Sequence, residues 1–268
     1  MSDHLLRVHA PITDEGWQRI DEEAQDRLRP GLAARRLVDF AGPLGWQHSA
    51  TNLGRVEPVD VGPLGDVEGR RRRVLPLVEL RAPFRVSLEE LRAGDRGAED
   101  VDFDALDAAA QRMVVAENTA VFHGWADAGI AGIVGASPHT PIPCGDEMDR
   151  YAGHVARAVE LLLDNGLGGP YGLALGRDEY TRVTETAEHG GYPLFDHLRK
   201  ILGGPIVWAP GVDGGVVLSM RGGDFLFESG QDLSVGYDSH DADGVSLYLE
   251  ESFSFRIATP EAAVAITP

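Results

Sequence analysis

The chain contains 268 residues, enough for one large domain or two smaller ones with a substantial core. Its 43 acidic and 24 basic residues give a net charge of −19, which argues against general nucleic-acid binding because such binding needs a basic surface. The single cysteine, Cys144, excludes an intramolecular disulfide framework and suits a reducing compartment, and no apolar run approaches the ~18 residues of a membrane span.

The first element expected after an irregular N-terminal arm is a helix that begins at Thr13. The Thr13 hydroxyl can cap the first turn, and apolar residues recur at helical spacing until Pro30 and Gly31, which end the helix near Arg29. Residues 35–40 then predict a short strand, which ends at Gly42-Pro43.

Residues 46–74 predict an extended hairpin, since polar and apolar residues mix around several glycines. Val59 and Val61 can line one side of it, before a turn at Gly62-Pro63-Leu64-Gly65. Four consecutive arginines follow at residues 70–73. In a chain of net charge −19, we expect them to pair with acidic groups, including those of a neighbouring chain, rather than with nucleic acid. Residues 75–84 predict one further apolar strand.

Residues 101–125 predict a long helix, around which the other elements are arranged. Apolar side chains recur at helical spacing up to Gly124, which suits a left-handed C-cap, and Asp102 or Asp104 can cap the first turn. Glu117 lies on the apolar side of this helix. A buried carboxylate needs a partner, so we expect an arginine from another element to reach Glu117.

The second half of the chain mixes helices and strands. A helix is predicted at 149–164, followed by a strand at 171–175, helices at 178–187 and 194–201, and strands at 206–210 and 215–220. At least three strands follow from Asp224 onward. This order predicts an α+β or mixed α/β arrangement.

Three motifs that suggest chemistry have a simpler interpretation. The glycine-rich run at 166–171 follows a helix and enters a strand, which is the reverse of a phosphate-binding turn. Residues 239–250 match part of a calcium loop, but their flanks predict strands, so a hairpin turn at Asp243-Gly244 is favoured. His240 lies near Asp238 and Ser239 without a nucleophile-elbow motif, and no histidines have zinc-ligand spacing. The sequence therefore predicts no catalytic residue, no metal site and no enzymatic activity.

Several distinctive segments occur in an order that spans nearly the whole chain. In the first half they are Ala10-Pro11-Ile12-Thr13, Arg35-Arg36-Leu37-Val38-Asp39 and Leu75-Pro76-Leu77-Val78-Glu79-Leu80-Arg81-Ala82-Pro83-Phe84. In the second half they are Gly169-Pro170-Tyr171, His189-Gly190-Gly191-Tyr192-Pro193, Arg221-Gly222-Gly223-Asp224-Phe225 and Gly230-Gln231-Asp232-Leu233-Ser234-Val235-Gly236-Tyr237. In wording and order the chain resembles the family 1, linocin/bacteriocin-like encapsulins, which assemble icosahedral nanocompartments.

This resemblance implies the tailed-phage major-capsid fold, which is an α+β fold. It assigns residues 1–40 to an N-terminal arm and helix, and residues 41–76 to an extension loop. Residues 77–128 and 220–268 form the peripheral domain with its spine helix, and residues 129–219 form the axial domain. The extension loop is expected to reach a neighbouring subunit, which explains how an isolated two-stranded ribbon can be stable.

The resemblance also implies a function, which is to form a closed cytoplasmic shell of about sixty copies around a cargo protein. The usual cargo is a dye-decolourising peroxidase or a ferritin-like iron-storage protein, captured by a short C-terminal targeting peptide. The matching motif places Arg35, Leu37 and Asp39 in the groove for this peptide. Leu37→Asp is then expected to abolish cargo binding and to leave the shells intact. The alternative role of these residues is ordinary strand packing.

The loop Glu188-His189-Gly190-Gly191-Tyr192 resembles the stretch around the five-fold pore of the family. Symmetry would there gather Glu188 and His189 into a ring, which predicts an effect on the entry of charged solutes. The alternative is that His189 packs against the adjacent helix end.

Glu89 stands where some relatives carry an aromatic residue against flavin, so no cofactor is expected. The expected partners are other copies of the chain and the cargo, with no nucleic acid and no membrane. Two other classes remain open. A phage-type capsid protein would need a basic interior arm, and a bacteriocin-like protein with protease activity would need a catalytic constellation.

Overall fold

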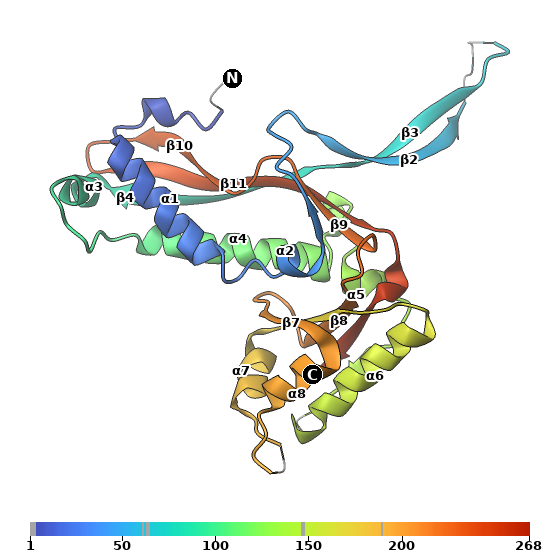
Figure 1. The fold of residues 1–268 in the computed structure, drawn as a ribbon. Coiled ribbons are helices and arrows are strands. Elements are labelled where there is room, and N and C mark those ends of the chain that lie inside the picture. The colour runs from blue at the N-terminus through green and yellow to red at the C-terminus, as the bar shows by residue number, and fades with distance from the viewer. Residues whose placement is uncertain (1–3, 61, 63–64, 146–147, 189) are drawn as a thin grey trace.

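Two five-stranded sheets and a separate two-stranded ribbon organise the chain (Figure 1). The computed structural model describes residues 4–60, 62, 65–145, 148–188 and 190–268. The first sheet has the order β1-β9-β11-β10, with β4 also paired to β11, and the second has the order β5-β12-β8-β6-β7. The ribbon consists of β2 and β3.

The strands have the following bounds: β1 Asp39–Ala41, β2 Ala50–Val59, β3 Gly69–Pro76, β4 Val78–Ser87, β5 Ile142–Pro143, β6 Tyr171–Leu175, β7 Gly203–Trp208, β8 Gly215–Ser219, β9 Phe225–Ser229, β10 Ser234–His240, β11 Gly244–Ile257 and β12 Ala263–Thr267. The α-helices are α1 Asp14–Leu28, α2 Ala34–Leu37, α3 Leu88–Asp95, α4 Asp104–Phe122, α5 Ile133–Ala136, α6 Tyr151–Asp164, α7 Arg177–Glu185 and α8 Leu194–Leu202.

Helix α4 is the long helix expected from the sequence, and it packs against β4 and α1. Asp102 Oδ1 accepts a hydrogen bond from the backbone N–H of Asp104 at 3.0 Å. Gly124 has a φ of 95° just beyond the last turn, a value that suits a residue without a Cβ. Helix α1 begins after Thr13, whose hydroxyl accepts from the Gly16 N–H at 3.0 Å. The predicted caps of both helices are therefore confirmed.

The second sheet forms the other half of the molecule, drawn below the first in Figure 1. Strands β6 and β8 are buried along their whole length, and helices α6 and α8 pack against the sheet. The order strand, helix, helix, strand, strand from β6 to β8 is the order that the sequence predicts. Each predicted boundary differs from the observed one by a few residues at most.

The extended hairpin is confirmed as the ribbon β2–β3, which projects from one end of the molecule (Figure 1). Arg71 pairs with Glu57 at 2.6 Å and Arg70 with Glu68 at 3.0 Å, so two of the four consecutive arginines take acidic partners within the chain. Val61 and the Pro63-Leu64 part of the predicted turn lie outside the described residues.

Two predicted elements are wrong. The strand expected at 35–40 is divided into the short helix α2 and the strand β1. The reason is a tertiary contact, since the buried Asn118 side chain of α4 accepts from the N–H groups of Ala33 and Ala34 and fixes the start of the helix. The single strand expected at 75–84 is two strands, which are interrupted at Leu77, where the backbone N–H donates to Ser49 O instead.

The predicted hairpin turn before β11 is confirmed. Strands β10 and β11 are antiparallel neighbours, and Asp241 Oδ1 accepts from the N–H groups of Asp243 and Gly244. Here His240 contacts the hydroxyl of Tyr237, and Ser239 donates to Asp238. Ser239 and His240 thus have different partners and do not form a serine–histidine pair, so this segment is a hairpin turn and not a catalytic triad.

Candidate functional site

A groove of about 960 Å³ lies between α1, the connection from α1 to α2, and the strands β10 and β11. Its lining residues come from both ends of the sequence and are Asp21, Ala24, Gln25, Leu28, Arg29, Pro30, Leu32, Arg35, Arg36, Asp232, Leu233, Ser234, Val235 and Leu249. Apolar side chains and charged groups of both signs therefore share one open surface. Such a surface suits a peptide that has apolar anchors and polar ends.

The groove wall formed by α1 is held against β10 by the N-terminal arm. Arg7 forms a bidentate ion pair with Asp21 of α1, at 2.8 and 2.7 Å, and its Nε donates to Val235 O at 2.8 Å. The Arg7 guanidinium also lies 4.6 Å from the centre of the Trp17 ring. One arginine thus joins the helix and the strand that border the groove.

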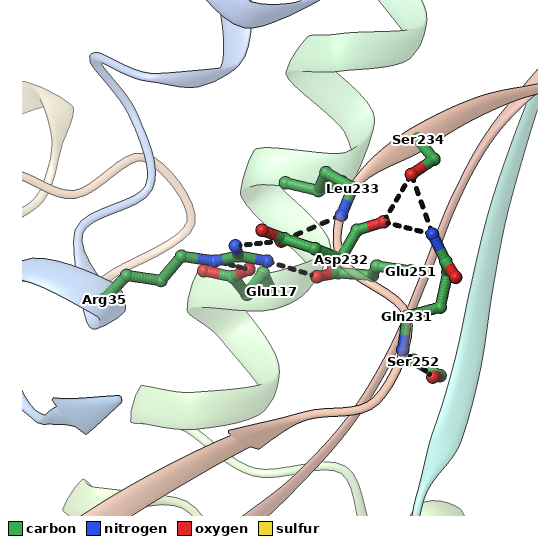
Figure 2. Close-up of polar contacts among 8 residues, drawn as sticks. All are labelled: Arg35, Glu117, Gln231, Asp232, Leu233, Ser234, Glu251 and Ser252. Carbon is green, nitrogen blue, oxygen red and sulfur yellow. Dashed lines mark hydrogen bonds and ion pairs between the residues drawn. The ribbon is translucent and has the colours of Figure 1, made fainter. Parts of the chain in front are cut away.

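A buried cluster of charged groups, centred on Arg35, lies beside this groove (Figure 2). Arg35 Nε donates to Glu117 Oε2 at 2.7 Å, and its Nη2 donates to Glu251 Oε2 at 2.7 Å. Its Nη1 donates to Asp232, which lies at the solvent-exposed edge of the cluster. The prediction that an arginine from another element reaches Glu117 is confirmed.

The Arg35 cluster, which consists of Arg35, Glu117, Asp232 and Glu251, places one positive charge among three carboxylates. Burial by itself would lower the pKa of Arg35, but the carboxylates of Glu117 and Glu251 raise it above its ordinary value. Burial, and then the nearby Glu117 carboxylate, raise the pKa of Glu251 well above the ordinary carboxyl value, against the opposing effect of Arg35. Burial also raises the pKa of Glu117. Of the two fully buried glutamates, Glu251 therefore retains its proton to a higher pH than an ordinary carboxyl group does.

This cluster makes folding stability depend on pH, and Glu251→Gln is expected to weaken that dependence. Above the ordinary carboxyl pKa and below the raised pKa of Glu251, the folded chain keeps a proton that the unfolded chain releases. The free energy of unfolding therefore falls as the pH rises through this window. Glutamine carries no titratable proton, so Glu251→Gln should flatten the fall.

The measurement is the urea midpoint of parent and variant at matched protein concentrations from about pH 5 to about pH 9. Glu160→Gln, which changes an exposed residue of α6, is the control and should keep the slope of the parent. If the urea midpoint of Glu251→Gln falls with pH as steeply as that of the parent, Glu251 is not the group that causes the pH dependence.

The structure brings only one of the three predicted groove residues to the groove. Arg35 lines it. Leu37 is 2% exposed and belongs to the core, where its side chain lies against Gly172 of β6. Asp39 is exposed at the start of β1, and its Oδ2 accepts from the Gly223 N–H at 2.6 Å. Residues 35–39 are not one continuous strand, so their side chains do not line a common surface.

Asp232, Leu233 and Ser234 were not selected from the sequence as groove residues, although they line it beside Arg35. Asp232 is positioned by its own loop, since its Oδ1 accepts from the Leu233 N–H at 2.9 Å. The available signal was the run at 230–237, which is one of the segments that carry the family resemblance.

Glu188 of the predicted pore loop contacts helix α8 within the same chain. Glu188 contacts Nδ1 of His197 on α8, at 2.9 Å from both carboxylate oxygens. The amine nitrogen of Lys200 lies over the Tyr192 ring, 4.8 Å from the ring centre. Gly190 and Gly191 have φ values of 99° and 78°. His189 lies outside the described residues.

Glu89 lies in the first turn of α3, where it is exposed and pairs with Arg96 at 2.7 Å. Within the described part of the chain, no group of three or more His, Cys, Asp or Glu side chains is placed to hold a metal ion. The helices of that part include none that is long and apolar enough to cross a membrane.

The sequence matches, over residues 2–254, the Linocin_M18 family, described as "Encapsulating protein for peroxidase". It is 46% identical over 267 residues to the type 1 encapsulin shell protein of Rhodospirillum rubrum, a match that covers 98% of this chain and 95% of the relative. It is 40% identical to the type 1 encapsulin shell protein of Brevibacterium linens, with 98% and 99% covered.

The fold matches that of solved capsid-like particles. The virus-like particle from Pyrococcus furiosus superposes with a TM-score of 0.64 at 18% identity, over 94% of this chain and 99% of that one. The capsid of Myoviridae phage XM1 superposes with a TM-score of 0.55 at 10% identity, over 88% and 92%. These similarities confirm the predicted tailed-phage major-capsid fold. The family match and the curated relatives go further, and the chain belongs to the encapsulin shell-protein family.

Proposed function

We propose that this chain is the structural subunit of a closed icosahedral shell that encloses a cargo enzyme. Membership of a family of shell proteins carries the proposal, and the relatives' names favour a structural role over an enzymatic one. The projecting ribbon β2–β3 supports it further, because a two-stranded hairpin without a third strand is marginally stable unless another surface covers it. The nanocompartment would stand in the cytoplasm and contain about sixty copies.

The proposed domain assignment follows the two sheets. Residues 77–128 and 220–268 would form the peripheral domain, with α4 as its spine, and residues 129–219 the axial domain. Residues 1–40 would supply the N-terminal arm and helix, and residues 41–76 the extension loop. The loop at 188–192 would then surround a symmetry axis, with Glu188 held by His197.

The proposed occupant of the groove beside α1 is a short C-terminal targeting peptide of the cargo. Leu32 and Leu233, which are both partly exposed, offer apolar contacts, while Arg29 and Arg36 can meet the acidic groups and the terminal carboxylate of the peptide. The cargo proposed is a dye-decolourising peroxidase or a ferritin-like iron-storage protein. The family's description, which names peroxidase, supports the first of these.

The test of assembly is expression of the chain alone. Purified protein is expected to elute as a megadalton-scale particle and to give hollow shells by electron microscopy. A protein that remains monomeric or dimeric under native conditions would refute the proposed function.

The test of the groove uses the same shells with a co-expressed cargo that carries its C-terminal peptide. Leu233→Asp is expected to lower the cargo per shell at least tenfold, because a carboxylate would replace an apolar contact. Val8→Asp places the same charge on a 79% exposed residue outside the groove lining and should load like the parent. If Leu233→Asp shells load as much cargo as parent shells, the peptide binds at another place.

A further inference from the structure

The ribbon β2–β3 carries two arginines that oppose each other. Arg55 and Arg73 are direct partners in the β2–β3 ladder, so both side chains lie on the same face, and both are exposed. Within the described residues neither forms an ion pair, whereas the next arginine on that face, Arg71, is neutralised by Glu57. The face therefore presents an uncompensated pair of positive charges.

Such a pair weakens the ribbon that carries it. Like charges directly opposite each other in an antiparallel ladder are destabilising, and a two-stranded ribbon has little stability in reserve. The opposite face is apolar in part, with Val56 55% exposed and Val74 45% exposed. Both faces would be stabilised by a partner that brings carboxylates to the arginines and covers the valines.

The end of the molecule opposite the ribbon is strongly acidic. Figure 1 places α3 at one end of the folded molecule and the ribbon at the other. Residues 88–104, which include α3 and the loop to α4, contain seven acidic residues and two arginines. Within this stretch Glu99 and Asp100 are adjacent and exposed, and neither forms an ion pair with a described residue.

We propose that the Arg55–Arg73 pair binds the acidic loop at Glu99-Asp100 of a second copy of this chain, in a head-to-tail contact. The unpaired arginines at one end and the unpaired carboxylates at the other have opposite charge, and such a heterologous contact closes into a ring when the rotation between copies allows it. The proposal rests on the shell assembly proposed above and names the charged groups that join its subunits. A nucleic-acid partner is disfavoured, because a chain of net charge −19 repels phosphates.

The test is a charge swap between the two ends. Arg55→Glu with Arg73→Glu, and separately Glu99→Arg with Asp100→Arg, are each expected to reduce the yield of complete shells at least tenfold at low salt. The four changes combined should restore most of the yield, because the ion pairs re-form with reversed polarity. Arg55→Lys with Arg73→Lys keeps the charges and is the matched control, expected to assemble like the parent.

Far-ultraviolet circular dichroism of the unassembled variants checks that they fold, since Arg55 and Arg73 lie outside both hydrophobic cores. Parental shell yield from either double reversal, or no recovery in the combined variant, would overturn the contact. Nucleic acid bound to parent particles and lost from Arg55→Glu, Arg73→Glu particles of normal yield would also overturn it. A parent that forms no shells would instead refute the proposed function, on which the contact depends.

Discussion

Leu37→Asp is expected to prevent folding, and not merely to empty the shells. Leu37 is 2% exposed, and its side chain lies so close to Gly172 of β6 that a Cβ there would stand 2.5 Å from Leu37 Cδ2. Loss of a buried leucine side chain costs about 2–5 kcal/mol, and a carboxylate in that position adds a desolvation cost. The sum is comparable to the whole stability of many domains, which is about 5–15 kcal/mol.

The measurement is the soluble yield and the urea midpoint of the variant, compared with the parent at matched protein concentration. Leu37→Met is the matched control, since it preserves volume and should cost less than about 1.5 kcal/mol. Soluble Leu37→Asp shells that lack only cargo would instead show that Leu37 lines the peptide groove, as the family resemblance implies.

Arg35→Ala is expected to lower the free energy of unfolding by about 3–5 kcal/mol, the usual cost of removing one partner from a buried ion pair. Glu117 and Glu251 are both fully buried, and each loses its charged hydrogen bond when the guanidinium is removed. The Arg35 side chain also lies 5.2 Å from the ring centres of Phe40 and Phe227, so packing is lost together with charge.

Two further variants separate the charge effect from the packing effect. Arg36→Ala changes the exposed neighbour, which forms no ion pair with a described residue, and should shift the urea midpoint little. Adding Glu117→Gln and Glu251→Gln to Arg35→Ala should recover part of the lost stability, because the buried side chains at both positions are then uncharged amides. An Arg35→Ala midpoint equal to that of the parent would show that the cluster does not stabilise the fold.

Local patterns were sufficient to predict most elements of this chain. The apolar spacing and caps of α1 and α4 predict both helices, because helix formation depends on residues within a turn or two of each other. The order from β6 to β8 follows from short apolar runs punctuated by glycines and prolines. The sequence also predicted the ribbon β2–β3 and an arginine partner for the buried Glu117.

The candidate site needed the tertiary structure. Residues 35–37 are helical because Asn118, a residue remote in sequence, accepts hydrogen bonds from the N–H groups that begin α2. That helix directs Leu37 into the core and Arg35 toward the groove, whereas a strand would have given both side chains the same face. Likewise, only the packing of α4 against the sheet brings Glu117 and Glu251 to one arginine.

The sequence by itself therefore determined most of the elements, their order and the family, because periodicity, capping and shared motifs are properties of neighbouring residues. The tertiary structure decided which side chains line the groove and which are buried. It also decided that Arg55 faces Arg73, since the ladder register shifts between Asn52 and Arg55. Contacts of this kind depend on long-range packing, where one residue of offset turns a side chain to the opposite face of a strand.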